Sequence, residues 1–297
     1  MKTLYLDCGM GAAGDMLAGA LYDLLSEEQR AEFRNIAAAF SAVGLNVRCA
    51  AAEKCGIRGI HFAVEYMNTD ADEYAACIHE HEHLHEHEHC HEHEHCHEHE
   101  HNHEHEHEHL HHEHAHHHHH EHRNLFDVNK IIDESEIDEK AKDLAKRIFL
   151  RVAKAESKVH NETLENVHFH EVGAIDSIVD IIGTAILLCK INPDVIYSSI
   201  VNDGYGFIEC AHGMISVPVP ATSEIFAASN AITRQIDVDT ELVTPTGAAI
   251  IAEIASEFTT MPAMNVQKVG WGTGTKDLVI PNVLKVSLGE IKKKTKL

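Results

Sequence analysis

One segment of this chain cannot contribute to a folded core. In residues 79–122 histidine alternates with glutamate, and this segment holds 25 of the 30 histidines and 13 glutamates, with no lysine or arginine. Almost nothing apolar intervenes, so the segment cannot bury enough surface to offset the entropy of ordering it. We therefore expect a disordered, metal-binding insertion at 79–122 that separates two parts of one core, residues 1–78 and 123–297.

Composition limits the class of protein. The chain has 297 residues, 44% of them hydrophobic, which suffices for a globular core. Its net charge of −24 argues against a nucleic-acid partner, which requires a cationic surface. The N-terminus "MKTLYLDCGMG" lacks an apolar signal region and no apolar run is long enough to span a membrane, so we expect a soluble, cytoplasmic protein. The eight cysteines are scattered without a CxxC pair, which favours free thiols.

Short strands and helices alternate along the rest of the chain. A strand at 2–8 precedes a glycine loop and an amphipathic helix, and residues 45–66 read as a hairpin around Gly56 and Gly59. A pair of helices broken near Ser135 follows the insertion, and another helix ends near Leu188. Further strands are expected at 194–201, 232–238, 265–275 and 282–291, and further helices at 220–229 and 244–258. The pattern predicts an α+β fold, a mixed sheet with packed helices.

The stretch "VHFHEVGAIDSIVDIIG" concentrates potential metal ligands. His168 and His170 share one face of an extended segment, and Asp176 and Asp180 share one face of a helix. That helix is apolar nearly all round, so a buried Asp180 needs a cation, a metal or several donors. With Glu171, these residues form a mixed nitrogen and oxygen ligand set for a divalent transition metal. The alternative is structural: Asp176 caps the helix and backbone carbonyls satisfy the histidines.

The glycine loop has the spacing of a dinucleotide-binding motif. Gly9, Gly11 and Gly14 follow a strand and open a helix, but no acidic residue follows a second strand as a ribose ligand would. The helix N-terminus could still hold a phosphate. Asp15 in its first turn would repel an anion unless it binds a cation or caps the helix. A tight turn with Asp15 as cap is the alternative.

Three further positions are candidates without being decisive. His212 precedes a glycine and could act as a general acid, a ligand or a phosphate partner, although an isolated histidine is more often structural. Thr244 and Thr246 flank Pro245 at a helix start, where hydroxyls either cap the helix or hold an anion. The segment "GWGTGTKD" either cradles a ligand or turns the chain.

The histidine-rich segment, unlike a folded metal site, has no fixed ligand geometry that would select one metal. Its imidazoles suit Ni²⁺, Zn²⁺ and Cu²⁺ alike, so it specifies no particular metal and is best interpreted as a reservoir. Its metal binding should weaken as the pH falls through the imidazole range, because the ligating form is neutral.

Taken together, these motifs resemble the LarC-type nickel-insertion proteins, which complete the nickel-pincer nucleotide cofactor of lactate racemase. The resemblance is carried, in order, by "DCGMGAAGDMLAGAL", the His-rich insertion, "VHFHEVGAIDSIVDIIG", "GYGFIECAHGMISVPVPAT", "ELVTPTGAAII" and "GWGTGTKDLVIPNVLKVSLGE". It covers essentially the whole chain outside the insertion.

The resemblance implies a nickel chelatase of the lyase class. Its substrate would be pyridinium-3,5-bisthiocarboxylic acid mononucleotide, with CTP hydrolysed to CMP and pyrophosphate and lactate racemase as the downstream acceptor. The delivery site would comprise His168, His170, Glu171, Asp176 and Asp180. Asp15 and His212 would be catalytic, with Gly9, Gly11, Gly14, Thr244 and Thr246 binding the mononucleotide or the metal bridging to it.

Full-length members of that family continue into a C-terminal domain, whereas this chain stops at "LGEIKKKTKL". The resemblance implies that CTP, with Mg²⁺ or Mn²⁺, binds that domain, supplied as a separate or fused chain. A homo-oligomer is compatible with these expectations.

Two other functions remain open. The first is a nickel storage or chaperone protein without catalysis, for which the insertion is the whole function. The second is a metal-dependent hydrolase that uses Asp7, Asp15, His168 and His170. Cys8, beside the glycine loop, is either a soft metal ligand or a small buried residue.

Overall fold

The fold was taken from a computed structural model of the chain. It describes residues 1–38, 40, 45–66, 123–169, 175–210 and 213–292. These residues belong to one compact unit that draws on both sides of residues 68–120. The predicted disorder of 79–122 lies outside the described residues, and the predicted domain boundaries stay a prediction.

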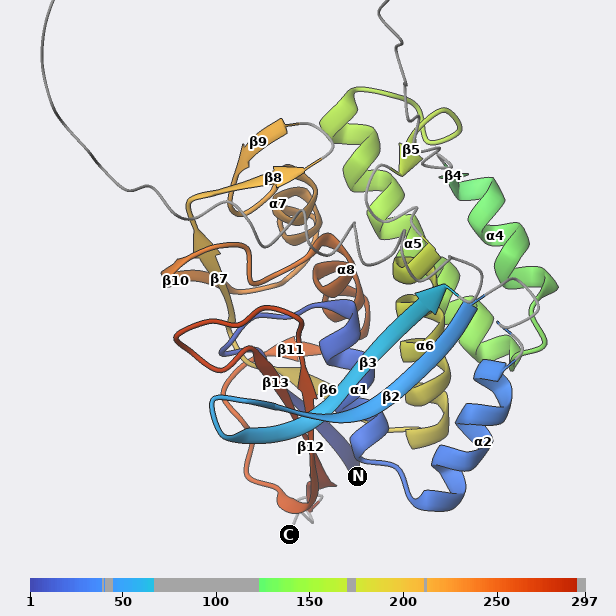
Figure 1. Cartoon of the computed structure of the whole chain (residues 1–297), viewed down its shortest axis with the longest axis vertical. Helices are drawn as coiled ribbons and strands as arrows, with labels where there is room; N and C mark the ends of the chain where they lie inside the picture. The colour runs from blue at the N-terminus through green and yellow to red at the C-terminus, as the bar shows by residue number, and fades with distance from the viewer. Residues whose placement is uncertain (39, 41–44, 67–122, 170–174, 211–212, 293–297) are drawn as a thin grey trace, which may run out of the picture. The chain divides into compact units, whose positions relative to one another are not determined.

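The described residues form seven α-helices and several β-strands (Figure 1). In chain order they are β1 (Lys2–Asp7), α1 (Gly14–Asp23), α2 (Glu27–Ala37), β2 (Leu45–Lys54), β3 (Ile57–Tyr66), β4 (Arg123–Asn124), α4 (Leu125–Glu134), α5 (Glu139–His160), β5 (His168–Phe169), α6 (Ile175–Ile191), β6 (Val195–Ser198), β7 (Val201–Tyr205), β8 (Phe207–Cys210), β9 (Gly213–Ser216), α7 (Pro220–Ala227), β10 (Thr233–Asp239), α8 (Pro245–Ile254), β11 (Glu257–Phe258), β12 (Asn265–Thr273) and β13 (Val283–Glu290).

A seven-stranded mixed sheet organises the fold, with strand order β11-β6-β1-β13-β12-β3-β2. β1 runs parallel to β6 and antiparallel to β13, while β12 joins β13 to the β2–β3 hairpin. Strands that precede residue 67 therefore pair with strands that follow residue 122. The predicted mixed sheet with packed helices is confirmed.

Helix α1 packs directly on the sheet, against β3, β12 and β13. Two glycines of β12 permit this close approach. A Cβ atom on Gly272 would lie 1.8 Å from the backbone oxygen of Met16, and one on Gly270 would lie 2.2 Å from that of Ala20. Any side chain at either position would force α1 off the sheet.

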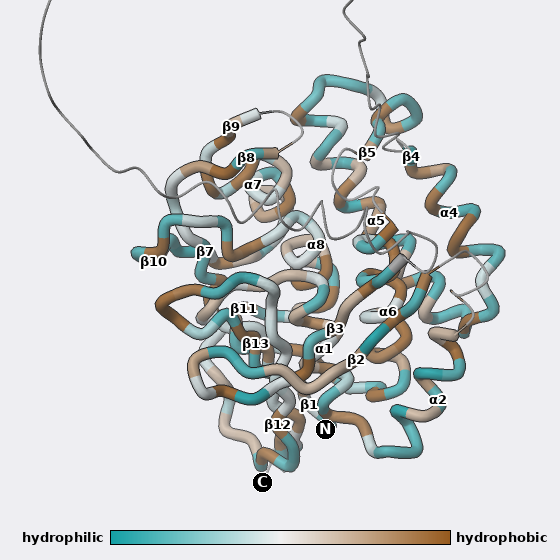
Figure 2. Tube along the Cα trace, viewed as in Figure 1, coloured by the Kyte–Doolittle hydropathy of each residue, from teal (hydrophilic) through white to brown (hydrophobic). Residues whose placement is uncertain are grey.

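The remaining helices build outward from α1. Figure 1 shows α6, α5 and α4 in succession beyond α1, each in contact with the next. α6 is buried along most of its length, as its apolar sequence predicts, while hydrophilic and hydrophobic residues alternate along α4 and α5 (Figure 2). Asn124 caps α4 in a reciprocal capping box, and α4 ends at Ser135, the break expected from the sequence.

Three expectations about boundaries were wrong, and one pair of strands was not expected. The run 194–201 is two strands in different sheets, because β6 joins the large sheet whereas β7 pairs with β10. Helix α8 ends at Ile254, and Glu257–Phe258 forms β11 beside β6. Gly59 lies within β3 rather than in the hairpin turn. Residues 207–210 (β8) and 213–216 (β9) pair antiparallel in a small sheet that the sequence analysis did not predict.

None of the helices in the described part of the chain combines the length and the apolar character that crossing a membrane requires.

Candidate functional site

The first turns of three helices meet around a hollow of about 220 Å³. α1 contributes Gly14 and Asp15, α6 contributes Asp176, Ser177 and Asp180, and α8 with its cap contributes Thr244 and Thr246. Six of these seven residues were candidates from the sequence alone. The structure places Gly14 at the end of the glycine loop, α6 with its two aspartates, and the segment 244–246 around the same hollow, although they are far apart in sequence.

Gly14 is what allows α1 and α6 to meet so closely. A Cβ atom on Gly14 would lie 2.7 Å from Asp180 Oδ2 and 2.8 Å from Thr246 Cγ2. These distances are shorter than van der Waals contact, so only glycine fits between the two helices here. Gly14 thus sets the position of the Asp180 carboxylate relative to the first turn of α1.

The loop before α1 is held against the segment before α8. The backbone N–H of Ala12 donates to the Leu242 carbonyl at 2.9 Å, and that of Thr244 donates to the Ala12 carbonyl at 3.1 Å. Gly11 has φ +93°, and a Cβ atom there would lie 2.3 Å from the Leu242 oxygen. Gly9 and Gly11 therefore shape the loop and do not line the hollow, whereas Gly14 does.

Two carboxylates of the hollow have strongly raised pKa values. Burial raises the pKa of Asp15 to about 6, although the Met16 N–H donates to its carboxylate at 2.7 Å. Burial likewise raises the pKa of Asp180 well above its usual range, and the negative charges of Asp15 and Asp176 raise it further. Like charges crowded in this way are costly, and proton uptake or a bound cation relieves that cost.

The helix ends supply the opposite polarity. The N-terminus of a helix carries partial positive charge on N–H groups without helical partners, and three such ends face this hollow. Carboxylate oxygens can bind a divalent cation here while backbone N–H groups bind a phosphate. In the described part of the chain, no group of three or more His, Cys, Asp or Glu side chains is already arranged around one metal position.

The structural alternative for Asp15 is wrong, whereas the residues that precede α6 lie outside the described part of the chain, so the alternative for Asp176 stays a prediction. The N-cap of α1 is Ala13, without a side-chain capping bond, so Asp15 is not the cap. Asp176 is the second residue of α6 and accepts the Ser177 N–H at 2.8 Å. Thr244 does cap α8, since its hydroxyl oxygen accepts the Gly247 N–H at 3.1 Å.

The predicted histidine ligands are not assembled at the hollow by the described residues. His168 lies in β5, exposed and opposite Asn124, while its neighbour Phe169 is buried against Phe149. His168 does not line the hollow. His170, Glu171 and His212 lie outside the described residues.

Sequence reasoning missed two residues at this site. Glu241 lines the hollow, three residues before Thr244. His61 on β3 lies close enough to lower the pKa of Asp15, and its Nδ1 is 3.2 Å from the Thr273 carbonyl. A carbonyl partner favours a proton on Nδ1. His61 could have been found as one of only five histidines outside the insertion.

The contacts of Cys8 and Asp7 indicate structural rather than catalytic roles. Burial raises the pKa of the Cys8 thiol to about 12, and its sulfur lies 3.6 Å from Ser198 Oγ, so it stays protonated. Asp7 forms an ion pair with Lys285 at 2.7 Å and does not line the hollow with Asp15. The described residues thus give no support to a hydrolase site that combines Asp7 with Asp15.

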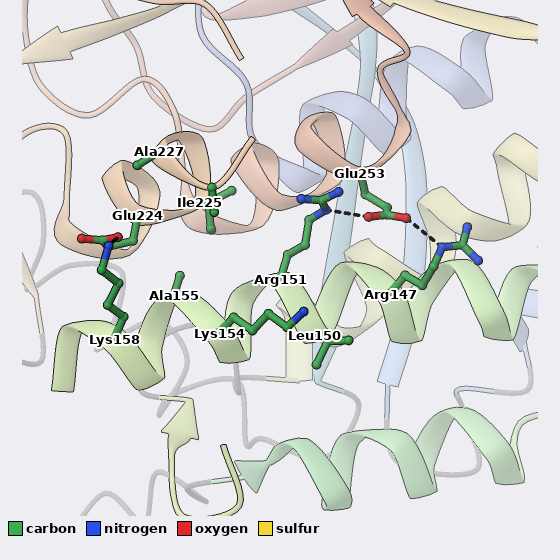
Figure 3. Close-up of a pocket in the computed structure, with 11 residues that line it drawn as sticks. Arg147, Leu150, Arg151, Lys154, Ala155, Lys158, Glu224, Ile225, Ala227 and Glu253 are labelled. Carbon is green, nitrogen blue, oxygen red and sulfur yellow. Dashed lines mark hydrogen bonds and ion pairs between the residues drawn. The ribbon is translucent and has the colours of Figure 1, made fainter. Parts of the chain in front are cut away.

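A second hollow, of about 400 Å³, lies between α5 and the helices α7 and α8. Figure 3 shows Arg147 and Arg151 both reaching Glu253, at 2.7 and 2.5 Å, and Lys158 reaching Glu224 at 2.5 Å. These ion pairs use most of the positive charge along this side of α5 to fasten the three helices together. The hollow between α1, α6 and α8 is therefore the better candidate site.

A hollow lined by three aspartates at the N-terminal ends of three helices is chemically suited to a cation, and the comparisons with known proteins specify the family. Residues 4–297 match the family model described as "Nickel insertion protein". The chain belongs to this nickel insertion family.

Several relatives carry the name pyridinium-3,5-bisthiocarboxylic acid mononucleotide nickel insertion protein. The relative from Acetivibrio thermocellus is 43% identical over 297 residues, which is 100% of this chain and 62% of that protein. The relative from Geobacillus kaustophilus is 36% identical over 294 residues, 98% of this chain and 60% of that protein. This chain thus spans about 60% of the length of the curated relatives it matches. No solved structure matches it.

Proposed function

We propose that this chain takes part in inserting Ni²⁺ into pyridinium-3,5-bisthiocarboxylic acid mononucleotide, as the names of its relatives indicate for those proteins. Nickel is the substrate of this reaction rather than a resident cofactor. The chain would hold the ion in the hollow between α1, α6 and α8 until the organic substrate receives it.

The observation that carries the proposal is the crowding of Asp15, Asp176 and Asp180 at one hollow. A divalent cation would stabilise three mutually repelling carboxylates, so the hollow has a physical reason to take one up. His168, which does not line the hollow, and His170 and Glu171, which lie outside the described residues, stay proposed members of the delivery set, and His212 stays a catalytic candidate.

The direction of transfer follows from ligand chemistry. Carboxylate oxygens are hard ligands that bind Ni²⁺ less firmly than sulfur donors in a square-planar arrangement. An ion held by aspartates therefore moves downhill to the thiocarboxylate sulfurs of the mononucleotide. The role of the protein is to present a partly dehydrated ion beside its acceptor and to keep competing ligands away.

The finer features of the reaction form part of the same proposal. We infer that the reaction consumes CTP with Mg²⁺ or Mn²⁺, that it belongs to the lyase class, and that CTP binds a C-terminal region of the kind present in the longer relatives. Lactate racemase would accept the finished cofactor. This chain spans about 60% of the length of those relatives, so each of them has a further region that could bind CTP.

Nickel transfer to the mononucleotide tests the proposal. We would mix the full chain, a C-terminal region from a longer relative, CTP and the mononucleotide, and follow nickel transfer by the absorbance of the nickel–sulfur product. The Asp15→Asn, Asp180→Asn double variant should lose transfer, whereas Asp143→Asn on the exposed side of α5 should retain it. Equal transfer by the double variant and the wild type would reject the hollow as the delivery site.

Nickel storage is the second candidate, because the sequence holds 25 histidines in residues 79–122. Deletion of this segment separates the two functions. A storage protein would lose its nickel-dependent function altogether, whereas an insertion protein without the segment would need more nickel and still transfer it.

A further inference from the structure

Asp203, at the middle of β7, is a buried carboxylate that uses only one of its two oxygens. The residue is 2% exposed. Its Oδ1 accepts three backbone N–H groups, from Gly204 at 2.8 Å, Leu242 at 2.9 Å and Val243 at 3.1 Å. These bonds tie β7 to the segment that leads into α8.

The other oxygen, Asp203 Oδ2, has no hydrogen-bond partner in the part of the chain that the structure describes. A carboxylate oxygen left buried without a donor is costly, and native proteins rarely keep one without a reason. Burial outweighs the three N–H bonds and the nearby Lys276 in setting the pKa of Asp203, which is raised. The oxygen is thus an acceptor without a donor.

Asp203 also lines a hollow of about 530 Å³, separate from the aspartate site. This volume lies within the usual range for pockets that bind small molecules. One wall is apolar, formed by Phe226 and Ala227 of α7 with Ala231. The rim is polar and exposed, with Ser223 on α7 and the side chains of Thr233, Arg234 and Gln235 on β10.

Gln235 and Arg234 differ in how many of their hydrogen-bond donors are still available to a ligand. Gln235 is opposite Asp203 in the β7–β10 pair, and its amide donates to the carbonyls of Gly204 and Val217. Arg234 uses its Nε to donate to Asn202 Oδ1 at 3.3 Å. Within the described residues, no hydrogen bond or ion pair is seen for the terminal NH₂ groups of Arg234, and a guanidinium matches the geometry of a phosphate.

We propose that this hollow beside Asp203 binds the mononucleotide: the ribose hydroxyls donate to Asp203 Oδ2, the pyridinium ring lies against Phe226, and the 5′-phosphate pairs with Arg234. A buried acidic acceptor for ribose hydroxyls and an aromatic wall for a flat ring are general solutions to nucleotide binding. This proposal rests on the proposed function, which supplies the class of substrate.

The same carboxylate connects this hollow to the candidate nickel site. Leu242 and Val243, held by Asp203 Oδ1, lie directly between Glu241 and Thr244, which both line the aspartate hollow. Asn202, the partner of Arg234, donates to the Gly9 carbonyl at 2.8 Å. The mononucleotide hollow and the nickel hollow therefore share the segment 241–244 and the glycine loop as common supports.

Calorimetric titration of the full chain with nicotinic acid mononucleotide, in a buffer without nickel, tests the proposal. This probe has the ribose 5′-phosphate and the pyridinium ring but no thiocarboxylate, so its binding does not depend on metal transfer. Asp203→Asn keeps an oxygen for Leu242 and Val243 and replaces Oδ2 by a donor. It should weaken probe binding roughly tenfold or more, because the ribose loses a charged acceptor.

Two further variants keep the test decisive if Asp203→Asn unfolds. Arg234→Met changes only the rim of the hollow. It should weaken binding of the mononucleotide but not binding of the corresponding riboside, which lacks the phosphate. Asp237→Asn, exposed on the same strand and outside the hollow, should bind the probe as the wild type does. Undiminished probe binding by folded Asp203→Asn, or by Arg234→Met, would overturn the proposal, as would a wild type that binds no probe at millimolar concentration.

The outcomes also separate this proposal from the proposed function. If Asp203→Asn or Arg234→Met loses probe binding but still binds nickel normally at Asp15 and Asp180, the mononucleotide site is supported independently of the nickel site. Failure of nickel transfer with intact, Asp203-dependent probe binding would reject the delivery site and leave this hollow in place.

Discussion

The carboxylate of Asp15, in the first turn of α1, raises the pKa of Asp180, in the second turn of α6. The two residues lie 165 positions apart in sequence and line one hollow. Their repulsion is a cost that the fold carries at neutral pH. This cost ties the stability of the protein to pH and to cations.

Asp15→Asn should stabilise the protein at pH 8 and have little effect near pH 4. The folded state holds the Asp15 proton more tightly than the unfolded chain does, because its folded pKa is about 6. The contribution of the Asp15 carboxyl to the free energy of unfolding is therefore fully present below about pH 4 and is lost as the pH rises from about 4 to about 6. The gain at pH 8 should be on the order of 3 kcal/mol, measured as the free energy of unfolding in urea. A variant that is equally stabilised at both pH values would contradict this account.

Gly14→Ala should destabilise the protein although alanine favours helices. In an open helix this change would stabilise by up to about 1 kcal/mol. Here the new Cβ atom would lie 2.7 Å from Asp180 Oδ2, so we expect a net loss of about 1–3 kcal/mol in the free energy of unfolding. Ser177→Ala, a change at the same hollow that adds no atoms, is the control and should stay near the wild type. A more stable Gly14→Ala protein would show that α1 and α6 are less closely packed than described.

Glu253→Gln should loosen the contact between α8 and α5. Glu253 accepts from both Arg147 and Arg151, and its side chain is only 13% exposed, whereas Arg147 is 56% exposed. Because solvent screens the arginines, we expect a loss of about 1–2 kcal/mol rather than the larger cost of a fully buried pair. Glu257→Gln, exposed in β11, is the matched control for the same chemical change. Thermal unfolding at low and high salt measures both, and an effect that does not shrink with salt would argue against ion pairing.

Thr244→Ala should destabilise α8 at its N-terminus. The substitution removes the hydroxyl that accepts the Gly247 N–H, a loss of about 1 kcal/mol for a typical cap. Thr244→Ser keeps the oxygen and should recover most of the stability, as chemical unfolding curves would show. Equal destabilisation by Ala and Ser would point to loss of the threonine methyl group rather than of the cap.

Amphipathic pattern alone predicted most of the helices and strands. α1 and α5 carry their apolar residues at helical spacing, and the structure buries these positions, whereas α6 is apolar on nearly all sides and is buried along most of its length. The boundaries that failed depend on contacts distant in sequence. The break between β6 and β7 is held by bonds from Ser199 N–H to the Leu6 carbonyl and from Cys8 N–H to Ser199 Oγ, which no local pattern reveals.

The candidate site was predictable in part for a similar reason. Asp15 and Thr244 stand out because each is polar at the start of an apolar helix, and Asp180 stands out because it lies within one. Glu241 and Asp203 lie in short irregular or strand segments, where an acidic residue is normally exposed, so their roles become visible only in three dimensions. Gly9 and Gly11 matched a phosphate-binding spacing, yet Gly11 serves contact with Leu242.

The pairing of β1 with β13 has a consequence for how the protein is made. Lys2 pairs with Glu290, so the centre of the sheet joins the first strand of the chain to the last described one. A ribosome that adds ~5–20 residues per second needs roughly 15 to 60 seconds to pass from one to the other. During that interval β1 has an unpaired edge, which is a risk for aggregation. Helices α4 to α6 contact elements that are near them in sequence, so they can form during this interval. Translation speed and chaperones should therefore govern the yield of soluble protein more than the stability of the folded protein does.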